Sequence, residues 1–200
     1  MSQLILKRFC LAVCGFFALN GCVPGSRLQS NKITPTGEYR IDFSMELLNA
    51  DYLLKEPDEM APITFIGGRY GINKFVDAGF NLILPFSLNM DLNWQITDSS
   101  FFKLPSTLST GFGLTPGKDA SIKAFYASYL IGNDFIFTSI KGMYDIAANP
   151  VNKTERFSPG FSVGLIKKTN SKVKIVLEIT RYYINNEWYT YPNLGITIGI

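Results

Sequence analysis

The chain has 200 residues, 19 of them basic and 16 acidic, with a formal charge of +3 and no histidine. This length suits one domain with a proper core or a small barrel. The near balance of charge gives no electrostatic footprint for nucleic acid, and the lack of histidine excludes Ser-His and Cys-His nucleophile pairs and imidazole-bound metals.

The first 21 residues have the pattern of a signal peptide. Lys7 and Arg8 form a basic start, and an apolar run follows from Phe9 to Leu19. This run is shorter than the roughly 20 residues that a membrane-spanning helix requires, but it suits the apolar part of a leader. With 19 basic residues less Lys7 and Arg8, against 16 acidic ones, the mature chain has a formal charge of +1.

The stretch Leu19-Asn20-Gly21-Cys22 resembles the lipobox of bacterial lipoproteins. The resemblance implies cleavage before Cys22 and acylation of its thiol and new amino group. Cys10 and Cys14 leave with the leader, so the folded part is expected to contain no disulfide. The alternative is a plain secretory leader that leaves Cys22 as an ordinary thiol. Inner-membrane lipoproteins usually carry aspartate after the cysteine, and Val23 in that place implies the outer membrane.

Three segments follow from these features. Residues 1–21 are expected to be the signal peptide, and residues 22–36 the lipidated N-terminus with a flexible tether, because they are polar and contain Pro and Gly without periodicity. Residues 37–200 are expected to form a β-barrel domain.

From Gly37 onward the apolar residues recur with a period of two, as in half-buried strands. The first such strand carries its apolar residues on odd positions from Tyr39 to Leu47, and residues 49–61 are predicted to form a long loop. A second strand runs from Ile63 to Tyr70. Residues 75–84 and 88–96 then have apolar faces on even positions, which an odd-length loop such as Pro85-Phe86-Ser87 allows them to share.

The second half continues the pattern. A loop over 98–105 precedes a strand with Leu108, Thr110, Phe112 and Leu114 outward, and the facing of residues 120–130 is ambiguous. Residues 135–146 form a further strand, 147–158 a long loop, and 161–165 part of an eighth strand. In the last hairpin a type I′ turn at Asn185-Asn186 is predicted to pair Leu177 with Leu194 and Ile175 with Ile196.

These elements predict an all-β fold, an antiparallel up-and-down barrel of about ten strands. The polar faces are rich in Gly, Asn, Ser and Thr, which suits a narrow lumen, and the strand lengths suit a tilted span of a bilayer. The apolar faces are therefore expected to point outward into lipid. The charges of the first strand (Glu38, Arg40, Asp42, Glu46) are expected to compensate those of the ninth (Lys172, Lys174, Glu178) across the tenth.

The final residues resemble the C-terminal assembly signal of bacterial outer-membrane barrels. Asn193, Gly195, Ile198 and Ile200 fit that pattern, although Ile200 stands where the family has an aromatic residue. With both ends in the periplasm, the odd-numbered connections should face outward and include the long ones. The connection at 98–105 is longer than this pattern predicts.

Few residues are candidates for chemistry. Asp77 and Asp91 are expected to be diagonal neighbours, as an acid–base pair or, more simply, as part of a polar network in the lumen. The segment 113–118 has the glycines and lysine of a phosphate loop with wrong spacing, and is interpreted as a hairpin turn. The sequon at Asn152 applies only to eukaryotic secretion. The aromatic cluster of residues 182–191 suits a membrane-interface girdle or a ligand site.

The favoured function is a non-enzymatic outer-membrane lipoprotein with a structural or surface-interaction role, and at most a narrow passage. The alternative is a lipid-anchored periplasmic barrel or sandwich that binds a hydrophobic ligand in an apolar interior. A barrel hydrolase or acyltransferase is disfavoured, because those known depend on histidine. No catalytic residue, cofactor or metal site is predicted, and the expected partner is the membrane, with lipid attached at Cys22.

Overall fold

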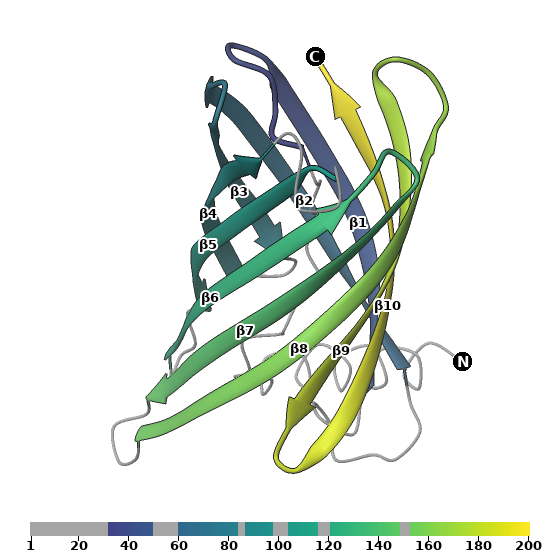
Figure 1. Ribbon diagram of the computed structural model, residues 1–200. Coiled ribbons are helices and arrows are strands. Elements are labelled where there is room, and N and C mark those ends of the chain that lie inside the picture. The colour runs from purple at the N-terminus through teal and green to yellow at the C-terminus, as the bar shows by residue number, and fades with distance from the viewer. Residues whose placement is uncertain (1–31, 50–59, 84–86, 98–103, 116–120, 149–152) are drawn as a thin grey trace, which may run out of the picture.

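The computed structural model describes residues 32–49, 60–83, 87–97, 104–115, 121–148 and 153–200. Ten antiparallel strands account for nearly all of them (Figure 1). The strands are β1 (Tyr39–Asn49), β2 (Met60–Asn73), β3 (Val76–Ile83), β4 (Ser87–Thr97), β5 (Ser106–Thr115), β6 (Ser121–Gly132), β7 (Ile136–Ala148), β8 (Lys153–Lys168), β9 (Val173–Ile184) and β10 (Glu187–Gly199). Within these described ranges, no helix has the length and apolar character needed to cross a membrane.

The sheet closes on itself, because β1 pairs with both β2 and β10. Every other strand pairs with its neighbours in sequence, so the barrel has the up-and-down order that the sequence predicts. The first strand begins and the last strand ends at the same end of the barrel, where Arg40 lies opposite Gly199 (Figure 1). This end is called the terminal end below, and the other end is called the loop end.

Hairpin registers follow from the parity of the apolar positions. In the last hairpin Leu177 pairs with Leu194 and Ile175 with Ile196, as predicted. Asn185 and Asn186 have φ of 51° and 70°, the positive values that a type I′ turn requires. Between β3 and β4 the connection is the three residues 84–86, an odd length, and the even-numbered apolar residues share one face.

Strand β8 is longer than predicted. The sequence predicts a loop over 147–158, but β7 extends to Ala148 and β8 begins at Lys153. In this part of β8 the inward side chain of Ser158 alternates with the exposed Phe157, and Pro159 resembles a loop signal. The proline is tolerated because the pairing of β8 with β9 begins only at Gly160, so the position of Pro159 needs no donor toward β9.

The facing of β6 is resolved by its neighbours. Ala124, Ser128 and Leu130 are buried in the interior, while Phe125 and Tyr129 are exposed. Both faces of this strand carry apolar residues, and this explains why periodicity alone left its orientation open.

Candidate functional site

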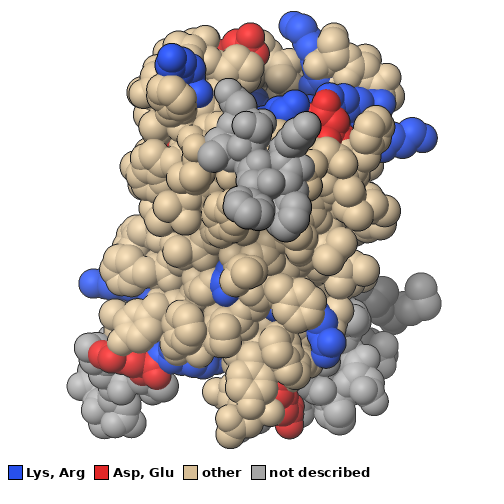
Figure 2. Space-filling model, in the orientation of Figure 1, with Lys and Arg blue, Asp and Glu red and all other residues tan. Residues whose placement is uncertain are grey.

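The outer wall of the barrel is apolar. Large hydrophobic side chains that are at least one-third exposed occur on every strand except β5, and Figure 2 shows a wide uncharged band between the two ends of the molecule. On two neighbouring strands they include Phe161, Val163 and Leu165 of β8 and Ile175, Leu177 and Ile179 of β9. A water-soluble protein rarely exposes apolar area on this scale, so the wall is suited to contact with hydrocarbon.

The predicted facing is therefore confirmed. Leu92 of β4, Ile175 of β9 and Ile196 of β10 are 40%, 37% and 43% exposed. The residues on either side of each of them along its strand point inward. Asp91 and Asn93, on either side of Leu92, are buried. This is the reverse of a soluble barrel with an apolar interior, the arrangement that binding of a hydrophobic ligand in the lumen requires.

A three-residue ionic cluster occupies the lumen between β2, β3 and β4. The Arg69 guanidinium donates to Asp77 through Nε at 3.1 Å and through Nη2 at 2.6 Å, and its Nη2 lies 2.5 Å from Asp91 Oδ1. The side chains of the three residues are at most 5% exposed. A bidentate guanidinium offsets part of the desolvation cost of two buried carboxylates, and the cluster keeps a formal charge of −1.

This cluster decides between the two interpretations of the aspartates. Asp77 pairs with Asn93 and Asp91 with Gly79, so the two carboxylates are diagonal neighbours, as predicted. Both are bound to one arginine and shielded from solvent, as the polar-network interpretation expects. Sequence reasoning did not single out Arg69, because its face of β2 also carries the apolar Ile63 and Phe65.

A second cluster joins strands on either side of β8. Lys141 Nζ of β7 donates to Glu178 Oε1 of β9 at 2.5 Å and to Thr180 Oγ1 at 3.3 Å. The inward positions of β8 opposite Lys141 and Glu178 are Gly160 and Gly164, and these glycines leave room for the two side chains to meet.

The predicted compensation between β1 and β9 is wrong for Arg40, Asp42 and Glu178, which have other partners. Arg40 binds Asp42 of its own strand at 3.0 Å, and Glu178 binds Lys141, while Glu38 and Lys172 lie exposed at the rim. Arg40 and Asp42 are two residues apart on the same face of β1, so the long Arg40 side chain reaches the Asp42 carboxylate directly. The inward placement of Arg40, Asp42, Glu46 and Glu178 is confirmed, since all four are buried.

Residues 32–36 enter the mouth of the barrel at the terminal end. The Thr34 amide donates to Asp77 Oδ2 at 2.7 Å, and the Ile33 amide donates to Gln95 Oε1 at 3.2 Å. Thr36 forms a parallel bridge with Gly71 of β2. Thr34 is 3% exposed, so this mouth segment covers the aspartate cluster from the terminal side.

The sequence places these five residues at the end of a flexible tether, and here the structure differs. Their backbone is held by β2, β3 and β4, because Gly71, Asp77 and Gln95 offer close approach or acceptors. Residues 22–31 and Cys22 itself lie outside the described residues.

Gly71→Ala is expected to displace the mouth segment. A Cβ at this position would lie 1.9 Å from the Pro35 carbonyl oxygen and 2.5 Å from that of Thr34, too close for either to stay in place. Overpacking of this kind costs about 1–3 kcal/mol. Limited proteolysis should then cleave near residues 32–36, and planar-bilayer recordings should show an increased ion conductance.

Gly199→Ala is the matched control at the same end of the barrel. Its Cβ would meet only the Lys172 carbonyl oxygen, at 3.7 Å, an ordinary contact. Equal protease sensitivity of the two variants would show that the mouth segment does not depend on Gly71.

Apolar and aromatic side chains fill the lumen at the loop end between β2, β3, β9 and β10. This buried cluster comprises Ile63, Phe65, Ile83, Tyr182, Ile184 and Tyr191. The predicted aromatic cluster is thus divided between two faces. Tyr182 and Tyr191 point inward, whereas Tyr183 and Trp188 stack on the outer wall with ring centroids 5.3 Å apart. The outer pair fits a girdle at a membrane interface, and the inner pair packs together in the lumen with ring centroids 6.1 Å apart.

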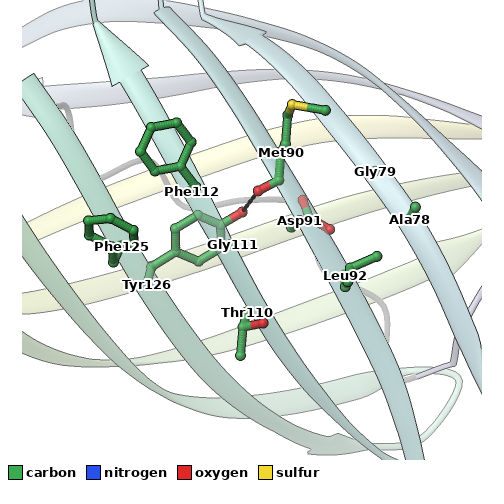
Figure 3. Close-up of a pocket in the computed structure, with 10 residues that line it drawn as sticks. All are labelled: Ala78, Gly79, Met90, Asp91, Leu92, Thr110, Gly111, Phe112, Phe125 and Tyr126. Carbon is green, nitrogen blue, oxygen red and sulfur yellow. Dashed lines mark hydrogen bonds between the residues drawn. The ribbon is translucent and has the colours of Figure 1, made fainter.

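The outer wall is hollowed over β3 to β6 (Figure 3). This hollow of about 530 Å³ is lined mainly by apolar groups, among them Met90, Leu92 and Phe112. The Tyr126 hydroxyl crosses Gly111 and donates to the Met90 carbonyl oxygen at 3.0 Å, and a Cβ on Gly111 would collide with it. Glycines at 79 and 111 make the wall thin here, and the inward-facing Asp91 also borders the hollow.

The remaining sequence candidates gain no site. Gly113 to Thr115 belong to β5, and the rest of the segment 113–118 lies outside the described residues. Asn152 is also outside them, immediately before β8.

No protein-family model and no curated protein sequence matches the chain. Among solved structures it is similar to the N-terminal β-barrel domain of Pseudomonas aeruginosa OprF, with a TM-score of 0.34, 7% identity, and coverage of 84% of this chain and 100% of that one. It is also similar to the KdgM porin, with a TM-score of 0.41, 10% identity, and coverage of 80% of this chain and 98% of that one. A third similar structure is Ail, the attachment invasion locus protein of Yersinia pestis, with a TM-score of 0.32, 8% identity, and coverage of 82% and 99%. At these identities the likeness concerns the fold alone.

Proposed function

We propose that the protein is a non-enzymatic outer-membrane lipoprotein whose small barrel crosses the bilayer and serves a structural or surface-interaction role. The observation that carries this proposal is the inverted polarity of the barrel, apolar on its outer wall and polar within. Hydrocarbon is the solvent in which this distribution has the lowest free energy.

The strand lengths agree with a membrane span. A tilted strand needs roughly 9–11 residues to cross the hydrocarbon region, and the strands range from 8 residues in β3 to 16 in β8. Each of the ten strands pairs with a neighbour on both sides in the closed sheet, and closure of this kind suits a bilayer because it leaves no strand edge open.

Side chains occupy much of the lumen, and this supports a structural role for the barrel and argues against a passage for solutes. Within the described residues, ionic clusters occupy its interior, the mouth segment covers the Asp77 side of the terminal end, and apolar side chains fill the loop end beside β2, β3, β9 and β10. The strands flanking residues 50–59 and 149–152 direct both connections to the loop end. With the terminal end in the periplasm, these connections face the exterior and are the surfaces available to a partner.

The lipid anchor is compatible with this orientation. Residues 23–31 connect Cys22 to Lys32 at the terminal end, and an extended segment of ten peptide units reaches at most about 35 Å. An acylated Cys22 could therefore enter the same leaflet that surrounds the terminal end of the barrel.

Cys22→Ala in the full chain separates the anchor from the span. Metabolic labelling with palmitate should mark the native protein and not the variant. The variant should nevertheless stay in the membrane fraction after extraction with alkaline carbonate, because its apolar wall holds it there. Release of the variant into the soluble fraction would contradict a membrane-spanning barrel, and persistent labelling would contradict acylation at Cys22.

A further inference from the structure

The terminal end carries a concentration of lysines around the β8–β9 turn. Residues 167–174 include Lys167, Lys168, Lys172 and Lys174 and no acidic residue. Lys32 of the mouth segment joins them, because Lys32 and Lys168 both bind Asp134 of the β6–β7 turn, at 3.2 Å and 2.7 Å. Figure 2 shows basic groups gathered at the upper right, the region where Figure 1 places the turn that joins β8 and β9.

The turn holds these lysines at defined positions. Asn170 Oδ1 accepts hydrogen bonds from the amides of Lys172 and Val173, at 2.8 Å and 2.7 Å. The Thr169 amide donates to the Val173 carbonyl oxygen at 2.9 Å, and the Gly199 amide donates to the Lys172 carbonyl oxygen at 2.8 Å. The turn is thereby fixed both internally and to the end of β10.

The local electrostatic field is positive. The pKa of the Asp134 carboxyl lies below its usual value, first because of the hydrogen bond from Lys168 and then because of the hydrogen bond and charge of Lys32. One carboxylate accompanies the four exposed lysines Lys32, Lys167, Lys168 and Lys172, so the patch retains an excess of positive charge that a phosphate group complements.

The patch lies directly at the end of an apolar strip. On the outward face of β8, Phe161, Val163 and Leu165 are exposed, and Lys167 is the next residue on that face. Lys167 is also the register partner of Ile175, from which the exposed apolar residues of β9 continue through Leu177 and Ile179. Lys167 follows Phe161 by six positions, a distance of roughly 20 Å along the strand, which is about the depth of one bilayer leaflet with its headgroup region.

We infer that the β8–β9 turn and the strip below it bind an anionic glycerophospholipid. The acyl chains lie along the outward side chains of β8 and β9, and the phosphate contacts Lys167 and Lys172. The site rests on the proposed membrane span, since the strip is accessible to acyl chains only in a bilayer. The lysines at the end of the apolar strip complement a molecule with an anionic headgroup and an apolar tail. Lysines at the ends of membrane-spanning strands reach such headgroups readily.

The charge at the loop end provides a matched comparison. Lys123 of β6 and Arg181 of β9 are exposed on the outer wall near that end, and Arg181 lies over the Trp188 ring at 5.4 Å. The variants K167Q/K172Q and K123Q/R181Q each remove two positive charges, from opposite ends of the same barrel.

The test uses the full chain reconstituted in bilayers that contain one part phosphatidylglycerol and three parts phosphatidylcholine. After gentle detergent extraction, native mass spectrometry measures which lipids stay bound. On the native protein we expect the ratio of bound phosphatidylglycerol to bound phosphatidylcholine to be about tenfold higher than the ratio in the bilayer, and on K167Q/K172Q we expect it to be close to the bilayer ratio. K123Q/R181Q and the charge-conserving K167R/K172R should keep the enrichment.

Two further measurements show whether the lysines bind a lipid or free phosphate, and whether the site or the proposed membrane span is wrong. Inorganic phosphate at 10-fold excess over lipid should not displace phosphatidylglycerol, and displacement would mean that the lysines bind phosphate without a lipid. Retention of both lipids in bilayer proportions by every variant would overturn the site and leave the membrane span intact. A protein that retains no lipid and stays soluble without detergent would instead overturn the span.

Discussion

Arg69→Met is expected to lower the free energy of unfolding by about 3–5 kcal/mol, because it leaves two carboxylates buried without their counter-ion. The Asp77 side chain is 0% exposed and that of Asp91 is 1%, so water cannot replace the guanidinium. Methionine has a similar length and keeps most of the packing. Urea titration of the folded barrel in detergent micelles, followed by tryptophan fluorescence, measures the change.

Two further variants keep this result interpretable. Arg181→Met removes an exposed arginine from the outer wall and is expected to change stability by less than about 1 kcal/mol. The triple variant R69M/D77N/D91N removes all the charges of the cluster and should recover much of the loss, because neutral amides cost less to bury than carboxylates. An Arg69→Met variant as stable as Arg181→Met would show that the cluster contributes little.

Leu177→Arg is expected to destabilise the barrel by about 2–4 kcal/mol in a bilayer, the cost of arginine at the lipid-facing midplane of a membrane barrel. Leu177 lies near the middle of β9 and is 45% exposed on the outer wall. If the same surface faced water, an exposed leucine could be replaced with a change within about 0.5 kcal/mol. Folding into vesicles of phosphatidylcholine as a function of urea concentration measures the difference.

Tyr183→Arg is the control for depth on the same strand and the same face. It lies next to the hairpin tip at Asn185, where the cost should fall to about 0–1 kcal/mol. Equal effects of the two arginines would mean that β9 does not pass through the hydrocarbon, and the proposed span would be rejected.

Local patterns predicted most of the fold. The period of two assigned the faces of β4, β9 and β10, and the parity of apolar positions set the register of the last hairpin. The loop prediction was wrong for residues 147–148 and 153–158, which belong to β7 and β8, because the small inward Ser158 and the adjacent Pro159 resemble loop residues. It was undecided for β6, which carries Leu130 inside and Phe125 outside.

The candidate site was predicted less completely. The diagonal placement of Asp77 and Asp91 follows from one hairpin, and it is confirmed. Their partner Arg69 comes from another strand, and the pairing of Lys141 with Glu178 depends on two glycines of β8 that separate them. Neither relation is visible in the spacing of residues along the chain.

The sequence by itself determined which side of each regular strand is apolar and how adjacent strands align, because alternation and turn parity act over a few residues. Only the tertiary structure decided how the sheet closes and which buried charges meet across the lumen. It also decided that residues 32–36 occupy the mouth. These contacts join residues such as Thr34 and Asp77, 43 positions apart, and depend on the stagger of all ten strands around the barrel.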